Sequence, residues 1–342
     1  MARPPLFQRA TVSRIVKESA DARTYVLAPH DGPLPYRAGQ FCTFKVTVDG
    51  HDLYRSYSMS SAPEVDGELM TTVKRVPGGR VSNWLHDNLV EGDVVEMTRP
   101  AGTFVLRPDT TPILGFSGGS GITPILSLTK SALATTDRPV RLLCADRDAD
   151  SIIFGDALAD LQARYDGRLT VIRHLDDHAG FLSADAVRDF VGEDVTADSY
   201  LCGPAAFMAL VEAALPDTGR VVAEDFGAVS TPEAETVEEA GAGPADAATD
   251  ECTVNVVLRK SKATVTAKAG DTILESARRA GMTPPFSCEA GNCGTCIATL
   301  TEGTAEMRVN DVLTDDEVAD GYVLTCQAVP TSASVTANYD DA

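Results

Sequence analysis

The chain has 342 residues, of which 44% are hydrophobic and 23% are charged, a composition typical of a globular protein with more than one domain. Its net charge of −21 argues against a basic surface for nucleic acid, and no segment approaches the ~20 apolar residues of a membrane span. The first ten residues lack an apolar core of signal-peptide length, so we expect a cytoplasmic protein and, by default, a monomer.

The first part of the chain has a sequence pattern that predicts β-structure. Residues 8–27 and 39–48 alternate between apolar and polar side chains, and glycine with proline marks turns at 31–33 and 77–79. Short alternating strands separated by such turns are typical of a small barrel. We therefore predict an antiparallel β-barrel over residues 1–108.

Two segments of this barrel carry candidate flavin ligands. In the first segment an Arg can fork onto a diphosphate, a Tyr can stack on an isoalloxazine ring and a Ser can reach its N5 atom. These residues are Arg55, Ser56, Tyr57 and Ser58. The motif alone is short enough to occur in an ordinary barrel strand. A second segment, 73–85, offers amides and a hydroxyl to phosphate at a helix start, through Val73, Lys74, Gly79, Val81 and Ser82.

Together these segments resemble the flavin-binding signature of the ferredoxin–NADP⁺ reductase superfamily. The resemblance implies FAD as the cofactor of the barrel. FMN remains an alternative, since similar chains with the same domain order use it.

From residue 112 the pattern changes to alternating strands and helices. We predict strands at 113–116, 140–145, 169–172, 199–201 and 221–222, with helices at 122–133 and 152–165. Such alternation indicates a parallel sheet covered by helices. We assign residues 109–228 to an α/β nucleotide-binding domain.

The turn after the first of these strands is rich in glycine, which lets the backbone approach a pyrophosphate. Its candidate ligands are Gly118, Gly119, Gly121, Thr123 and Pro124. A tight structural turn would look the same. However, Cys202, Gly203 and Pro204 follow a later strand and match a second motif of the same superfamily, at the nicotinamide end.

The resemblance covers residues 4–226 and implies catalytic roles for Ser58, Cys202 and Glu224, with Phe226 covering the flavin. The chain departs from stand-alone reductases, which end at this point, so Phe226 could be placed differently. Arg147, between Asp146 and Asp148, could bind a 2′-phosphate, whereas the flanking acids would repel it and bind ribose hydroxyls. We favour NADH, with NADPH as the alternative.

Residues 229–250 contain six acidic and no basic side chains and almost nothing to bury. We interpret them as an extended linker. After it, residues 251–342 begin with a strand at 252–258 and a helix at 273–280, with Thr272 and Glu275 as a capping box and Gly281 at the end. We predict an α+β module of β-grasp type.

Four of the eight cysteines, Cys288, Cys293, Cys296 and Cys326, have the spacing Cys-x4-Cys-x2-Cys followed by a remote Cys. This is the spacing of plant-type [2Fe–2S] centres, and Gly291 and Gly294 permit the tight loop that it needs. A structural zinc site would normally present two Cys-x2-Cys pairs, and this chain has one. Residues 251–342 thus resemble a plant-type ferredoxin.

A flavin converts hydride transfer into the single-electron steps that such a cluster accepts. We therefore predict an NAD(P)H-dependent oxidoreductase that passes electrons through FAD and the cluster to a partner. The order of the motifs resembles reductase components of multicomponent oxygenases, most of all the 3-ketosteroid 9α-hydroxylase reductase group. That resemblance implies a Rieske oxygenase as the partner, with di-iron hydroxylases, desaturases and cytochromes P450 as alternatives.

Two alternatives come from other classes. The cluster could serve as a redox sensor, although no effector or DNA-binding segment supports this, or the chain could be a free flavin reductase.

Overall fold

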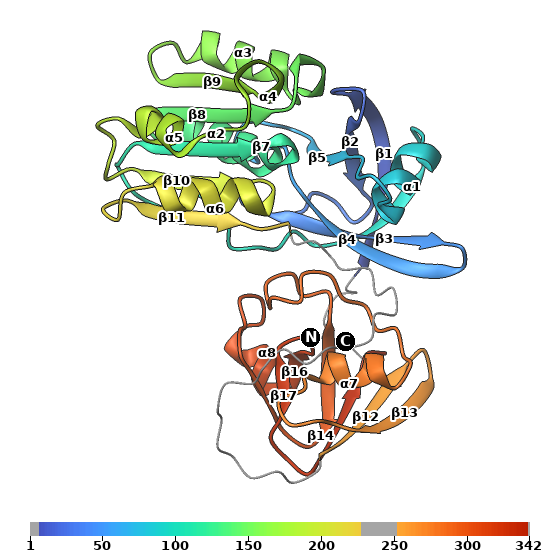
Figure 1. Ribbon diagram of the computed structural model, residues 1–342. Helices are drawn as coiled ribbons and strands as arrows, with labels where there is room; N and C mark the ends of the chain where they lie inside the picture. The colour runs from blue at the N-terminus through green and yellow to red at the C-terminus, as the bar shows by residue number, and fades with distance from the viewer. Residues whose placement is uncertain (1–6, 227–251, 341–342) are drawn as a thin grey trace. The chain divides into compact units, whose positions relative to one another are not determined.

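The computed structural model describes residues 7–226 and 252–340, which fall into two compact units. The predicted linker at 229–250 lies outside the described residues. None of the helices in the described ranges is long and apolar enough to cross a membrane. The multidomain architecture is the predicted one, with a flavin barrel, a parallel sheet and a ferredoxin-like module (Figure 1). The boundary predicted at 108/109 lies between β6 and β7 and stays a prediction.

The flavin barrel is one antiparallel sheet of six strands in the order β4-β3-β6-β1-β2-β5, closed by a bridge between Met59 and Thr71. Residues 8–27, predicted to be β-structure, form two strands separated by a turn at 18–21. Its elements are β1 (Phe7–Lys17), β2 (Ala22–Pro29), β3 (Phe41–Val48), β4 (His51–Ser58), β5 (Leu69–Lys74), β6 (Val94–Thr98) and the helix α1 (Arg80–Asn88).

The nucleotide domain is a five-stranded parallel sheet in the order β11-β10-β7-β8-β9. Its strands are β7 (Ile113–Gly118), β8 (Val140–Asp146), β9 (Leu169–Leu175), β10 (Asp198–Cys202) and β11 (Arg220–Glu224). The sheet extends from β7 through β8 to β9. The chain then returns and adds β10 and β11 on the other side of β7. Ligands of such sheets bind at the carboxyl ends of the strands beside this switch point.

Helices cover both faces of the sheet (Figure 1). The helices α2 (Ile122–Thr135) and α3 (Gly155–Arg164) pack on one face, and α5 (Ala184–Val191) and α6 (Ala205–Ala214) on the other. A short α4 (Asp176–Ala179) follows β9. The helix predicted at 152–165 begins three residues late, because Phe154 has a left-handed backbone with φ of 60°.

Side chains tie the barrel to the nucleotide domain. The Ser127 hydroxyl on α2 donates to the Ser61 carbonyl at 2.6 Å and accepts from the Gly39 amide at 3.1 Å. Lys130, one turn later, pairs with Asp66 at 2.9 Å. These contacts fix the barrel against α2, so groups on the two domains can form a single site.

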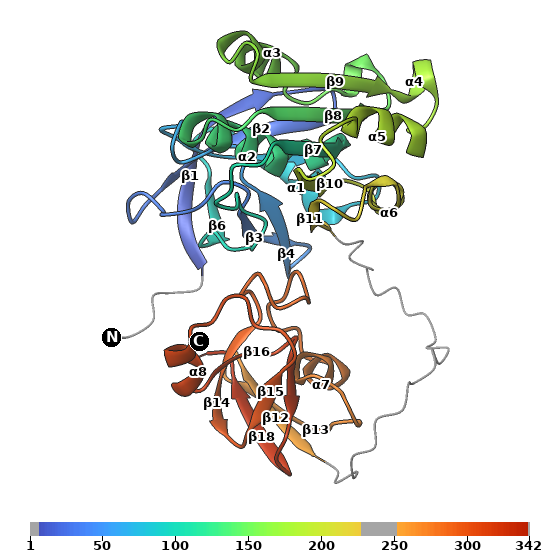
Figure 2. The same ribbon diagram turned by 90° about the vertical axis from the view of Figure 1, so that its left-hand side faces the viewer.

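The ferredoxin-like module has a five-stranded mixed sheet in the order β13-β12-β18-β14-β16. Its strands are β12 (Thr253–Leu258), β13 (Ser261–Thr266), β14 (Ile297–Glu302), β16 (Tyr322–Leu324) and β18 (Ser334–Asn338), and β15 (Ala305–Met307) pairs with β17 (Ala328–Pro330). Figure 2 shows α7 (Ile273–Arg279) beside β12 and β13; α8 (Asp315–Ala319) precedes β16. The capping box of Thr272 and Glu275 is confirmed.

Candidate functional site

The predicted flavin segment 55–58 lies on β4. The ring of Tyr57 meets Phe44 edge-on, with ring centroids 5.8 Å apart, and Arg55 donates to the Tyr54 carbonyl at 2.7 Å. The hydroxyls of Ser56 and Thr43 lie 2.9 Å apart across β3 and β4. Burial raises the pKa of Tyr57 and lowers that of Arg55.

The second flavin segment forms the end of β5 and the start of α1. The helix begins after Gly79, which offers no side-chain cap to the first amides, so a phosphate can accept their hydrogen bonds. Ser82 accepts from the Val76 amide at 3.1 Å and thereby closes the preceding loop, and both Val73 and Val81 are buried. The backbone and side chains present thus fit a flavin diphosphate.

The glycine-rich turn and the segment 202–204 meet at the carboxyl ends of β7 and β10. The parallel register places Cys202 opposite Ser117. A β-carbon on Gly121 would lie 2.0 Å from the Cys202 carbonyl oxygen, and one on Gly118 would lie 2.8 Å from Pro204 Cδ. A β-carbon on Gly203 would likewise come within 2.9 Å of the backbone of Gly118. Glycine is therefore required for this close approach of two loops.

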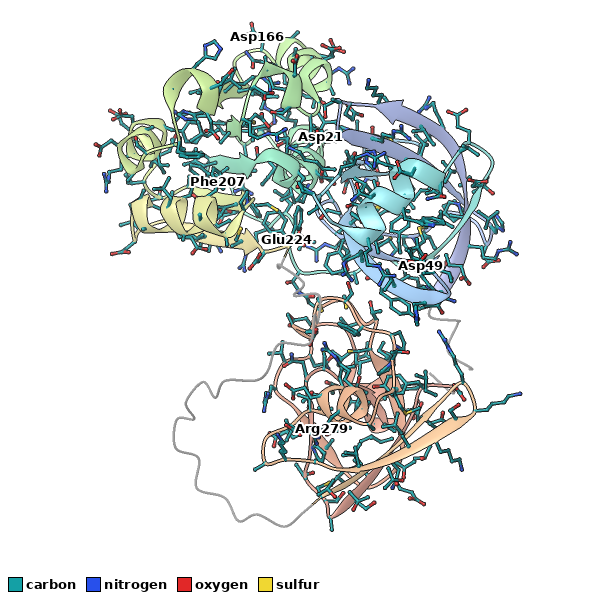
Figure 3. The ribbon with its side chains drawn as sticks, turned by 45° about the vertical axis from the view of Figure 1, so that its right-hand side comes forward. Asp21, Asp49, Asp166, Phe207, Glu224 and Arg279 are labelled. Atoms are coloured by element: carbon teal, nitrogen blue, oxygen red, sulfur yellow. The ribbon has the colours of Figure 1, made fainter. Side chains whose placement is uncertain are left out.

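Three predicted catalytic residues come from three strands. Ser58 on β4 donates to Glu224 Oε2 on β11 at 3.3 Å, and the register of β10 and β11 sets Glu224 opposite Cys202. Glu224 is labelled in Figure 3. Burial raises the pKa of Glu224 to about 8, with the bond from Ser58 acting in the opposite direction. Burial also raises the pKa of Cys202, helped by the neighbouring carboxyls. Both shifts favour the protonated carboxyl of Glu224 and the neutral thiol of Cys202 at this corner.

A cavity of about 730 Å³ opens between the barrel and the carboxyl ends of the sheet. The predicted residues that line it are Gly118, Gly119, Lys74, Arg147 and Pro204. Gly121, Thr123, Pro124 and Cys202 lie buried beside it and do not line it. The Thr123 hydroxyl is buried without a hydrogen-bond partner among the described residues. A cavity of this size with such a turn fits a dinucleotide.

Sequence reasoning pointed to Asp146 as a candidate for ribose binding but missed much of the remaining cavity wall. Asp21 and Asp176 contribute carboxyl groups, and Phe181, Phe207 and Leu210 contribute apolar surface. Phe207, on α6, is labelled in Figure 3. Burial raises the pKa of Asp146 to about 6. Asp146 ends β8, as its place beside Arg147 had suggested, whereas nothing in the sequence marks the other wall residues. Phe226 is 43% exposed at the end of the first unit, and its role over the flavin stays a prediction.

The four predicted cluster ligands form two close pairs. Cys288 is hydrogen-bonded to Cys293, and Cys296 to Cys326. The bond lowers the pKa of Cys288 because its thiolate accepts from the other sulfur. Cys293, Cys296 and Cys326 are buried. All eight cysteines are free of disulfides.

Backbone amides point at these sulfurs. The Ala290 amide donates to Cys288 Sγ at 3.3 Å, and the Thr295 amide donates to Cys293 Sγ at 3.4 Å. Gly291 and Gly294 have φ values of 82° and 69°, as the tight loop requires. No group of three or more metal-ligating side chains surrounds a single point in the described ranges. Two cysteine pairs suit two irons better than one zinc ion.

Comparison with protein families matches three models. Residues 9–106 match an oxidoreductase FAD-binding domain, residues 116–213 an oxidoreductase NAD-binding domain, and residues 256–331 a 2Fe-2S iron-sulfur cluster binding domain. The predicted cofactors FAD, NAD and [2Fe–2S] are therefore confirmed at the level of the domains.

Relatives match nearly the whole chain. The ferredoxin reductase component of 3-ketosteroid-9-alpha-monooxygenase from Mycolicibacterium smegmatis is 35% identical, covering 96% of each chain. The glycine betaine monooxygenase reductase subunit of Pseudomonas aeruginosa is 32% identical over 93% of this chain and 91% of its own. The structure of phthalate dioxygenase reductase matches with a TM-score of 0.60 and 26% identity over 97% and 98% of the two chains. The chain thus belongs to the family of oxygenase reductase components that join FAD-binding, NAD-binding and [2Fe–2S] domains.

Proposed function

We propose that this chain takes electrons from NADH and passes them through FAD and the [2Fe–2S] cluster to a terminal oxygenase. The observation that carries the proposal is the pairing of four cysteine sulfurs, two by two, in the same chain as a nucleotide cavity bordered by a flavin barrel. When bound, the flavin accepts a hydride and the cluster carries one electron at a time.

The chain's own side chains would bind and orient these groups. Arg55 and the start of α1 would hold the flavin diphosphate, with Tyr57 against the ring and Ser58 near its reactive edge. Cys202 would lie near the nicotinamide, and Glu224, whose pKa is raised by burial, would hold a proton close to Ser58. The four cysteines would bind the irons as thiolates.

We favour NADH over NADPH because Asp21, Asp146 and Asp176 all line the cavity. A 2′-phosphate there would meet negative charge, whereas ribose hydroxyls can donate to carboxylates. We favour a Rieske oxygenase of the 3-ketosteroid 9α-hydroxylase type as the acceptor, because the M. smegmatis relative is the reductase component of a 3-ketosteroid-9-alpha-monooxygenase. We further propose that the protein is a cytoplasmic monomer.

The test separates entry of electrons from their exit. Cys293→Ser in the full chain should leave flavin reduction by NADH within about twofold of the wild-type rate, while reduction of the oxygenase is lost. Cys252→Ser provides the matched control, since Cys252 lies in the same module outside the four-cysteine set. Stopped-flow absorbance of the flavin and turnover of the oxygenase measure the two steps. Equal loss of both steps, or loss of neither, would contradict the proposed order.

A further inference from the structure

An ion-pair group joins the barrel to the nucleotide domain at the wall of the cavity. Asp21 lies in the turn between β1 and β2, on the side of the barrel beside the nucleotide domain (Figure 3). Its Oδ2 atom is 3.4 Å from Arg147 Nη2 and 3.8 Å from Lys74 Nζ. All three residues line the cavity.

Arg147 holds the position at which this fold reads the adenosine ribose. It follows β8, and an acid there binds the 2′-hydroxyl while an Arg accommodates a 2′-phosphate. This chain has both, since Asp146 is buried at the same corner. The neighbouring Asp148 does not bind Arg147 in the described structure. Its carboxylate instead accepts from the Ser151 amide at 2.8 Å.

We propose that Asp21, a residue of the flavin barrel, determines the nucleotide preference by holding Arg147 away from a 2′-phosphate. The inference rests on the proposed function, which assigns the cavity to NADH. Asp21 acts in two ways: its carboxylate occupies the guanidinium, and its charge repels a second anion at the same wall. The preference is thereby set across the domain boundary and not by the nucleotide domain alone.

The expected size of the effect follows from exposure. The side chain of Arg147 is 68% exposed and that of Asp21 27%. Ion pairs of this kind change an equilibrium constant by about fivefold at most. Loss of the nearby charge adds a comparable factor at low ionic strength. We therefore expect Asp21→Asn to improve binding of a 2′-phosphorylated ligand, relative to its unphosphorylated counterpart, by about five- to twentyfold.

The experiment uses the full-length holoprotein and two ligands, 5′-AMP and 2′-phosphoadenosine 5′-phosphate, with calorimetry at low salt. Lys74 Nζ lies 3.4 Å from a β-carbon built on Gly119, in the turn proposed to bind the 5′-phosphate that both ligands share, so we expect release of Lys74 to cancel in the ratio of dissociation constants. Glu68→Gln is the matched control. Glu68 pairs with Arg14 at 2.6 Å on the same barrel and does not line the cavity. The Glu68→Gln substitution therefore removes the same charge as Asp21→Asn, but away from the cavity.

We expect the ratio to shift by about five- to twentyfold in Asp21→Asn and by less than twofold in Glu68→Gln. In an Arg147→Ala background the same Asp21→Asn change should give a smaller gain, because only the repulsion by the Asp21 charge is then removed. The ratio of kcat/KM for NADPH over NADH should rise by a similar factor, mainly through KM for NADPH. A shift below twofold in Asp21→Asn, or a gain that is undiminished in the Arg147→Ala background, would overturn the inference. Failure of both ligands to bind the wild-type protein would instead refute the assignment of the cavity.

Discussion

Glu224 joins the barrel to the end of the sheet through its bond from Ser58, and burial raises its pKa from the ordinary 4.5 to about 8. Between these two values the folded protein keeps a proton that the unfolded chain releases. The contribution of this protonated carboxyl to the free energy of unfolding is complete below pH 4.5 and is lost as the pH rises through 8. Glu224→Gln, which cannot ionise, should remove this loss.

The magnitude follows from the shift. A difference of one pKa unit corresponds to ~1.4 kcal/mol, so a shift of ~3.5 units sets an upper limit of ~5 kcal/mol for the loss between pH 4.5 and 8. Glu224 as a residue is only partly buried, so solvent screening lowers this limit. We therefore expect the wild type to lose ~2 kcal/mol relative to Glu224→Gln between pH 5.5 and 8.5.

Urea unfolding of the holoprotein, followed by flavin fluorescence with the same excess of FAD in all samples, measures this difference. Subtracting the unfolding free energy of the variant from that of the wild type at each pH cancels the contributions of all other titrating groups. Glu212→Gln, an exposed carboxyl change on α6, should leave the profile parallel to that of the wild type. If the profiles of Glu224→Gln and wild type were also parallel, the buried proton would not exist.

Three further predictions concern the scaffold and the exit of electrons. Asp198→Ala leaves Arg138 buried without the carboxylate that pairs with it at 2.7 Å, and should destabilise the parallel sheet by ~3–5 kcal/mol. The double variant Arg138→Met with Asp198→Leu should recover most of this stability, and hydrogen exchange at β7 and β10 measures both effects. Gly121→Ala should abolish binding of 5′-AMP in calorimetry, with flavin retained, because its β-carbon would overlap the Cys202 carbonyl. Rising salt should slow reduction of the partner oxygenase, since residues 251–342 carry 13 acidic and 7 basic side chains; an unchanged rate would exclude charge-assisted docking.

The sequence anticipated the structure where the contacts are local. Cys288, Cys293 and Cys296 lie in one loop, and the capping box of Thr272 and Glu275 spans four residues. In such cases spacing along the chain nearly determines spacing in space. The glycine turn at 118–121 was found for the same reason.

The sequence did not reveal contacts between distant segments. Asp21 looks like an ordinary turn residue, and only the packing of the barrel on the sheet brings it to Arg147, 126 positions away. Asp198 and Arg138 likewise look like surface charges, although both side chains are at least 98% buried. The pKa of Glu224 depends on burial and could not be obtained from its position at the end of a strand.

Strand register explains why these distant groups form one site. Cys202 stands opposite Ser117 on β7 and opposite Glu224 on β11, so two pairings fix one corner of the sheet. A slip of one residue in the β10–β11 pairing would turn the Glu224 side chain to the other face and break its bond with Ser58. The barrel side of that bond depends on the ties from Ser127 and Lys130 to the flavin barrel. The entry of electrons therefore requires a rigid junction of barrel and sheet, and variants that loosen this junction should slow flavin reduction without altering the four-cysteine loop.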